Sequence, residues 1–255
     1  MPTPRQLVAE GCPARRAPPA NNATPQGCFV LFDRHLEKSG GSTLSVLMQR
    51  LEEQGECMYW GYHVTGSAWS KIQTSLSSIT NDSPRLPRLC IDGHVGTILI
   101  GSSMVEKLGA WKRDMESRGV DCRLLRTMRV REPMSHYTSF YLWYKANKGD
   151  ARRDARASHL GDEGFIKWAN ATPNLQTNLL LHSMTTLYAQ TNLEARPARV
   201  PGYMQTEYEP GKARLIDMLK HFEIAAPLER FDEALLMTAD KLGLRHVQYA
   251  RVGAA

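Results

Sequence analysis

The chain has 255 residues, of which 42% are hydrophobic and 23% are charged, an ordinary composition for a globular domain. No segment approaches the roughly 20 consecutive apolar residues of a membrane helix, so we expect no membrane segment. The 32 Lys and Arg against 26 Asp and Glu leave a net charge of +6, which favours anionic partners such as a nucleotide, a polyanionic glycan, nucleic acid or an acidic membrane face. The alternative is a basic surface that serves solubility alone.

The N-terminal segment, residues 1–27, carries Pro, Ala, Arg and Asn without an apolar run. It predicts a disordered leader without a signal peptide, followed by a single domain over residues 28–250. The five cysteines are an odd number without a C-x-x-C pair, so we expect no zinc site. Three of them lie in or beside apolar runs, where free thiols usually act as small hydrophobic residues: Cys28, Cys90 and Cys122.

Apolar runs alternate with segments of helical period along the rest of the chain. The apolar runs predict strands at residues 28–32, 58–64, 89–95 and 121–130. The periodic segments predict helices near residues 44–51, 104–115, 132–148, 174–188, 212–222 and 231–242. Polar or Pro-rich stretches predict loops at residues 149–163 and 195–210. This order predicts βαβ units and therefore an α/β fold with a parallel sheet.

The segment H-L-E-K-S-G-G-S-T-L, residues 35–44, lies between the first predicted strand and the first predicted helix. Unpaired backbone N–H groups at a helix N-terminus hold phosphate oxygens, and glycines let the backbone approach an anion closely. The segment is not a Walker A loop, which reads G-x-x-x-x-G-K-[ST], so ATP with magnesium is disfavoured. The alternative is a Gly-Gly turn beside a solvated lysine. The residues expected to bind the anion are Lys38, Ser39, Gly40, Gly41, Ser42 and Thr43.

A histidine follows the third predicted strand, at the edge where α/β sheets bind ligands. This residue, His94, is the candidate general base because the intrinsic pKa of histidine suits proton transfer near neutral pH. A histidine at a strand end also serves as a structural residue, and that alternative stays open.

A second anion site is predicted where the fourth strand runs into a helix that begins with Pro133, a favoured position for proline. The spacing of four between Arg131, Ser135 and Ser139 predicts that they lie along one helical stripe. An arginine fork with hydroxyls suits a phosphate monoester. The alternative is a surface arginine beside a helix-face serine. The aromatic residues that follow are expected to serve packing: Tyr137, Tyr141, Trp143 and Tyr144.

Five segments in a fixed order resemble the carbohydrate sulfotransferase family that includes the heparan and chondroitin/dermatan 2-O- and 6-O-sulfotransferases. They are H-L-E-K-S-G-G-S-T, D-G-H-V, R-E-P-M-S-H-Y-T-S, N-x-Q-T and E-R-F-D-E, and the resemblance as a whole spans roughly residues 29–242. The family's first segment reads H-I-P-K-T-G-G-T-S, so Glu37 stands where the family has proline. A carboxylate beside an anion site opposes binding unless it points away.

The resemblance implies a P-loop-type three-layer α/β fold and 3′-phosphoadenosine 5′-phosphosulfate (PAPS) as donor substrate. It implies that Lys38 and the five residues after it hold the 5′-phosphosulfate, that Arg131 and Ser139 hold the 3′-phosphate, and that His94 is the base. It further implies a glycosaminoglycan-like carbohydrate acceptor and the Golgi lumen as compartment. We expect no metal, because sulfate carries less charge than phosphate and Lys38 can stabilise the leaving group. We also expect no nucleic-acid partner.

Two other functions remain alternatives. One is a small-molecule or nucleotide kinase with an unusual phosphate loop, which would require ATP and magnesium. The other is a non-catalytic anion- or glycan-binding module on the same fold, for which Glu37 is the supporting feature.

Overall fold

The computed structural model describes residues 27–61, 86–93, 102–148, 161–171, 173–181 and 208–249, with five positions between residues 70 and 77. Residues 1–26 of the predicted leader lie outside the described residues, as do His94, residues 149–160 of the loop predicted at 149–163 and residues 195–207 of the loop predicted at 195–210. Among the described residues, no helix combines the length and the apolar character needed to cross a membrane.

Five strands form one sheet in the order β2-β3-β1-β4-β5, and all four neighbouring pairs are parallel. The strands are β1 (Cys28–Arg34), β2 (Met58–Trp60), β3 (Arg88–Asp92), β4 (Cys122–Val130) and β5 (Ile224–Pro227). The helices are α1 (Gly41–Glu53), α3 (Ser102–Ser117), α4 (Pro133–Lys148), α5 (Gly161–Ala171), α6 (Leu175–Leu181), α8 (Tyr208–Leu219) and α9 (Phe231–Leu242). The predicted three-layer α/β fold is confirmed.

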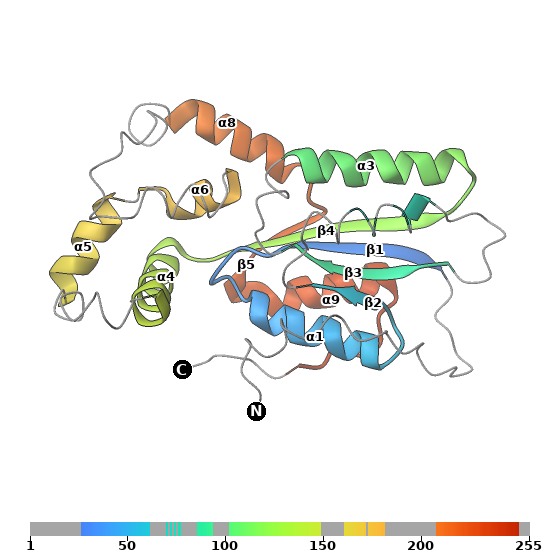
Figure 1. Cartoon of the computed structure of the whole chain (residues 1–255), viewed down its shortest axis with the longest axis horizontal. Helices are drawn as coiled ribbons and strands as arrows, with labels where there is room; N and C mark the ends of the chain where they lie inside the picture. Colours follow the sequence, from blue (N-terminus) through green and yellow to red (C-terminus); the bar gives the residue numbers. More distant parts are fainter. Residues whose placement is uncertain are drawn as a thin grey trace.

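Both faces of the sheet are covered, so β1 is apolar on both sides rather than alternating in polarity. Phe29 and Leu31 pack into one core with α1 and α9, whereas Val30 and Phe32 pack into the other, on the side of α3 and α8. Figure 1 shows α3 and α8 on one side of the sheet and α1 and α9 on the other. The period of two along the strand thus divides its side chains between two cores.

Three helices lie beyond the carboxyl ends of the strands, at the left of Figure 1: α4, α5 and α6. Their shared core is built on the buried indole of Trp168, which packs against Phe140, Tyr137 and Tyr141 with ring centroids 5.3–6.2 Å apart. Packing is thus the role of Tyr137 and Tyr141, as predicted. Trp143 joins the same cluster through Phe140.

The ends of two helices follow the local signals in the sequence. Gly55 has a φ of 72°, and its N–H donates to the carbonyl of Glu52. The N–H of Glu56 donates to the carbonyl of Leu51, so α1 ends in a Schellman motif. Helix α4 begins at Pro133, as predicted.

Several elements differ from the predictions. Helix α5 was not predicted, and α8 begins at Tyr208, inside the loop predicted to end at residue 210. Residues 161–163 form the first turn of α5 rather than the end of a loop. Strand β5 was not predicted, because four residues reading I-A-A-P carry no strand pattern and become a strand only by pairing with the edge of β4. The strand predicted to end at residue 64 is β2, which ends at Trp60.

Four of the five cysteines form disulfide bonds, so the expectation of free thiols is wrong. Cys28 is bonded to Cys122, which faces it in the register of β1 and β4, and Cys57 is bonded to Cys90. The pairs are 94 and 33 residues apart in sequence. Spacing alone cannot reveal such pairs, because they depend on which strands become neighbours.

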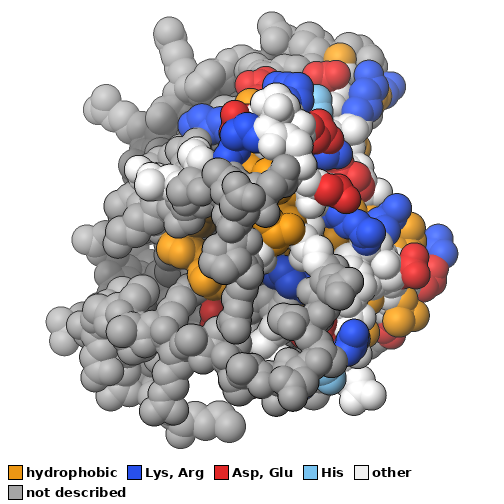
Figure 2. Space-filling model, turned by 90° about the vertical axis from the view of Figure 1, so that its right-hand side faces the viewer, with side chains coloured by type: hydrophobic (Ala, Val, Ile, Leu, Met, Phe, Trp, Pro, Cys, Tyr) orange, Lys and Arg blue, Asp and Glu red, His pale blue; other side chains and the backbone are white. Residues whose placement is uncertain are grey.

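The face at the amino ends of the strands is turned toward the viewer in Figure 2. Its described part carries Lys and Arg side chains interspersed with Asp and Glu side chains, so no field of one sign gathers there.

Candidate anion-binding site

The candidate site lies at the carboxyl ends of β1 and β4, which are neighbours in the sheet. After β1 the chain continues through α1 toward β2, on one side, whereas after β4 it continues through α4 and eventually to β5, on the other. Ligands of open α/β sheets bind in the crevice where neighbouring strands diverge in this way. The loop after β1 is the predicted anion loop, and Arg131 follows β4.

Two residues of the loop between β1 and α1 have a left-handed backbone conformation. Lys38 has a φ of 62° and Gly40, the N-cap of α1, has a φ of 81° and makes no side-chain cap. The N–H of Leu44 bonds to the carbonyl of Gly40. The amides of Gly41 and Ser42 therefore precede the first intrahelical bond, where N–H groups and the helix dipole favour an anion.

Side chains from β4, from α4 and from the residues between them hold three successive carbonyls of this loop. Arg129 Nε donates to Ser39 O at 3.3 Å, Arg131 Nη1 donates to Lys38 O at 3.3 Å, and His136 Nε2 donates to Glu37 O at 2.9 Å. In a trans peptide the N–H points opposite to the preceding C=O. Because these three carbonyls point toward β4 and α4, the N–H groups that follow them in the chain point away from β4 and α4.

His136 is fully buried, and burial lowers its pKa to about 4, reinforced by the positive charges of Arg131 and Lys38. A carbonyl oxygen can only accept, so Nε2 carries the proton of the neutral ring. His136 is therefore a neutral donor at physiological pH.

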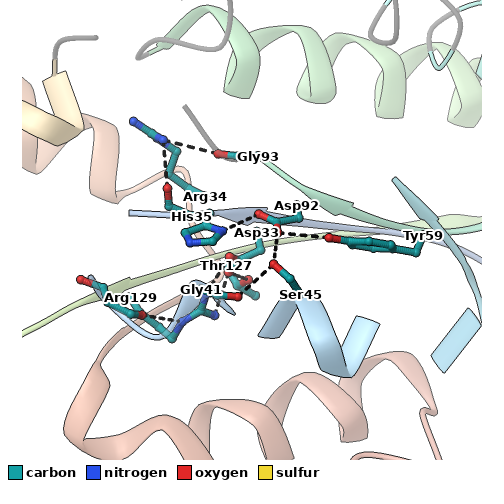
Figure 3. A network of polar contacts seen from close by, with 11 residues as sticks. Asp33, Arg34, His35, Gly41, Ser45, Tyr59, Asp92, Gly93, Thr127 and Arg129 are labelled. Carbon is teal, nitrogen blue, oxygen red and sulfur yellow. Dashed lines mark hydrogen bonds and ion pairs between the residues drawn. The ribbon is translucent and has the colours of Figure 1, made fainter. Parts of the chain in front are cut away.

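A second network holds the loop from the sheet side, centred on the carboxylate of Asp92 at the end of β3 (Figure 3). His35 Nδ1 donates to Asp92 Oδ1 at 2.8 Å, and the hydroxyls of Ser45 and Tyr59 donate to Oδ2. The His35 ring then fills the space beside Gly41, where a Cβ would lie 1.6 Å from Nε2. Glycine is thus required at position 41 by contact with the imidazole.

A buried ion pair completes the floor of the site. Arg129 forms two hydrogen bonds to the carboxylate of Asp33, at 2.8 and 2.7 Å, and Thr127 donates to the same carboxylate at 2.8 Å. The guanidinium also lies 5.4 Å from the ring centroid of Phe231. A fully hydrogen-bonded buried pair holds its geometry firmly, and removing one partner leaves an uncompensated charge.

Lys38 and Arg131 are the two cations beside the loop. Burial lowers the pKa of Lys38, and the charge of Arg131 lowers it further. Lys38 Nζ lies 6.0 Å from the ring centroid of Trp143 on α4. Because the charge of Arg131 acts on Lys38, an anion bound between them would relieve their repulsion.

The predicted helical stripe of Arg131, Ser135 and Ser139 is wrong in one respect. Arg131 precedes α4, so only the two serines lie along the helix. Glu132 caps the helix by accepting from the N–H groups of Met134 and Ser135. The structure thus brings Arg131 to the loop, whereas Ser139 lies two turns into α4 and is half-buried.

The predicted loop residues differ in exposure. The Ser42 side chain is exposed and that of Thr43 is buried. Ser39 is also buried, and among the described residues none accepts from or donates to its hydroxyl. Ser39 therefore contributes its backbone to the loop in this conformation.

Glu37 is buried, with 4% of its surface exposed. Its negative charge acts on the guanidinium of Arg34, whose pKa burial lowers while Glu37 and Asp33 oppose that change. Arg34 lies on the far side of the loop and donates to carbonyls of Gly93 and Leu179. The Glu37 charge is thus offset by Arg34.

Sequence reasoning missed several residues of the site: Asp33, His35, Asp92, Arg129, His136 and Gln176. A signal existed for the first three, because charged residues directly after apolar strands gather at one sheet edge. The register confirms this, since Asp33 faces Asp92 on one side and Thr127 on the other.

A small apolar cavity lies under the sheet, between α1, β4 and α9, lined by residues such as Leu47, Met128 and Leu235. It is lined mainly by core side chains, and it also borders Thr127 and Arg129, which form the floor of the anion site. Within the described ranges, no group of three or more His, Cys, Asp or Glu is placed to hold a metal ion.

Comparison of the chain with protein-family models, with curated proteins and with solved structures gave no match. The loop, Lys38, Arg131 and the side chains that hold them are therefore the basis for assigning a function.

Proposed function

We propose that this protein is a sulfotransferase that moves the sulfuryl group of PAPS to a hydroxyl of a carbohydrate acceptor. The observation that carries the proposal is the hydrogen bond from Arg131 to the carbonyl of Lys38, which ties two cations and a helix N-terminus to one sheet edge. A nucleotide with phosphates at both its 5′ and 3′ positions needs two such anion sites at a set spacing.

In this proposal the amides before α1 hold the 5′-phosphosulfate, and Lys38 stabilises the charge that develops on the leaving bisphosphate. Arg131 binds the 3′-phosphate through its remaining donors, with Ser139 as the second predicted ligand. Sulfuryl transfer resembles phosphoryl transfer, in which positioning and charge stabilisation supply most of the rate. A site whose backbone is pinned at three carbonyls suits such a reaction.

His94 is proposed as the base that deprotonates the acceptor hydroxyl. Its support is its place in the sequence, two residues after Asp92 in the D-G-H-V segment, since Asp92 ends β3 at the sheet edge that carries the loop. If it is the base, His94→Ala binds donor as the wild type does and loses about 10²–10⁴-fold in turnover. A folded, donor-saturated variant that keeps more than about a tenth of the wild-type rate contradicts the assignment.

The Golgi lumen is proposed as the compartment. The two disulfides support it, because such bonds persist in the oxidising compartments of the secretory route and are rare in the cytosol. Trapping free thiols on the protein in intact cells tests it, and thiols of Cys28 and Cys57 that label without reductant speak against this compartment.

The decisive experiment is a transfer assay with radiolabelled PAPS across a panel of glycans, run beside thermal shifts with 3′,5′-bisphosphoadenosine and with ATP and magnesium. Transfer of label to a glycan supports the sulfotransferase, provided that the melting temperature rises with 3′,5′-bisphosphoadenosine and not with ATP and magnesium. A shift and turnover with ATP and magnesium alone supports a kinase. Binding of the bisphosphate without transfer to any acceptor supports a non-catalytic module.

A further inference from the structure

The backbone of Arg131 is held by a side chain from a distant helix. The N–H of Arg131 donates to Gln176 Oε1 at 2.8 Å, and Gln176 Nε2 donates to the carbonyl of Arg131 at 2.6 Å. One amide side chain therefore satisfies both polar groups of one residue, as a neighbouring strand would.

Arg131 needs this partner because of where it lies. Strand β4 ends at Val130 and α4 begins at Pro133, so neither the strand ladder nor the helix provides bonds for the Arg131 peptide. Half-buried backbone groups without partners are costly. Gln176 supplies the two bonds from α6, a helix that arrives 45 residues later in the chain.

Helix α6 is itself anchored at two other points. The N–H of Leu175 donates to the Tyr137 hydroxyl at 3.1 Å, and Arg34 donates to the carbonyl of Leu179 at 3.1 Å. Gln176 thus connects the anchored helix α6 to Arg131, whose guanidinium donates to the Lys38 carbonyl of the loop.

We infer that Gln176 is a positioning residue that sets Arg131 at a fixed distance from the anion loop and so determines selectivity for a nucleotide with a 3′-phosphate. The inference rests on the proposed function. Gln176 contacts no substrate in this scheme. It acts by holding the peptide from which the guanidinium extends, so its loss leaves the 5′-phosphate site intact.

The test measures the affinities of 3′,5′-bisphosphoadenosine and of adenosine 5′-phosphate by calorimetry, and takes their ratio for each protein. Gln176→Met keeps the length of the side chain and removes both hydrogen bonds. We expect it to lower the ratio about tenfold while the affinity for adenosine 5′-phosphate stays within about twofold. Gln176→Asn, which keeps the amide but is one methylene shorter, should lower the ratio as well and serves if the first variant does not fold.

The matched control is Tyr137→Phe, which removes the Leu175 bond between α4 and α6 without touching Arg131. We expect its ratio to equal that of the wild type. An equal fall in Tyr137→Phe would show that docking of α6 in general controls selectivity and would overturn the inference.

Two outcomes separate this inference from the proposed function. A wild-type protein that does not prefer the bisphosphate over adenosine 5′-phosphate refutes both. A wild-type protein that prefers it, with Gln176 variants that prefer it equally, refutes only the positioning role.

Discussion

The buried imidazole of His136 makes the stability of this protein depend on pH in a direction that the structure determines. Burial lowers its pKa from 6.5 to about 4 in the folded state. Between these values the unfolded chain binds a proton that the folded protein does not, so stability rises with pH and is lost as the pH falls. Above about pH 7 the imidazole is neutral in both the folded and the unfolded state, so the protein there keeps the full stability that is lost at lower pH.

The size of the effect follows from the same values. One pKa unit is worth about 1.4 kcal/mol, so lowering the pH from 7.5 to 4.5 should cost about 2.5 kcal/mol through this one residue. His136→Gln removes the titration and keeps a donor for the Glu37 carbonyl. We therefore expect the wild type to lose about 2.5 kcal/mol more than this variant over that range.

Urea unfolding of both proteins at pH 7.5 and 4.5 measures the difference. His136→Phe serves as the matched control, because it lacks both the titration and the hydrogen bond. It should show the pH dependence of His136→Gln but a lower stability at pH 7.5, by about 1 kcal/mol. Equal losses of stability in the wild type and both variants would refute the reasoning, since the folded imidazole would then titrate as it does in the unfolded chain.

Three further outcomes follow from the site and its frame. Gly41→Ala forces a Cβ into the His35 ring and should cost at least about 2 kcal/mol by urea unfolding. Gly109→Ala in α3, where a Cβ would make only an ordinary contact at 3.5 Å with the Arg113 side chain, should cost nothing, and similar values for both variants would contradict the close contact. Lys38→Ala should abolish sulfuryl transfer with an unchanged melting temperature, and a wild-type rate would argue against the loop as donor site. Cys28→Ser opens a disulfide that spans 94 residues and should cost about 2–5 kcal/mol in non-reducing urea; an unchanged midpoint would mean that the bridge does not form.

Much of the site could be anticipated because it depends on local pattern. A glycine pair after an apolar strand and before a helical period predicts an anion loop; Lys38 to Gly40 lie in the loop after β1, and Gly41 to Thr43 form the first turn of α1. Pro133 predicts the start of α4, and Arg131 consequently lies just ahead of it. Local signals of this kind act through backbone geometry within a few residues, so they need no knowledge of the rest of the chain.

The partners of these residues could not be anticipated in the same way. The Arg131 peptide is held by Gln176 from 45 residues away, and the His35 ring by Asp92 from 57 residues away. Each pair depends on the strand order and on the angle at which a helix docks. The predicted stripe of Arg131, Ser135 and Ser139 was wrong for Arg131, which precedes α4, because a spacing of four has meaning only inside a helix.

The sequence by itself determined the α/β class, the placement of the anion loop and the start of the helix after Arg131, because hydrophobic period and turn residues act locally. Only the tertiary structure decided the order of the strands, the strand character of β5, the pairing of four cysteines and the side chains that hold the loop carbonyls. These features join residues far apart in the chain, and such contacts are selected by the collective packing of two cores on one sheet rather than by any segment alone.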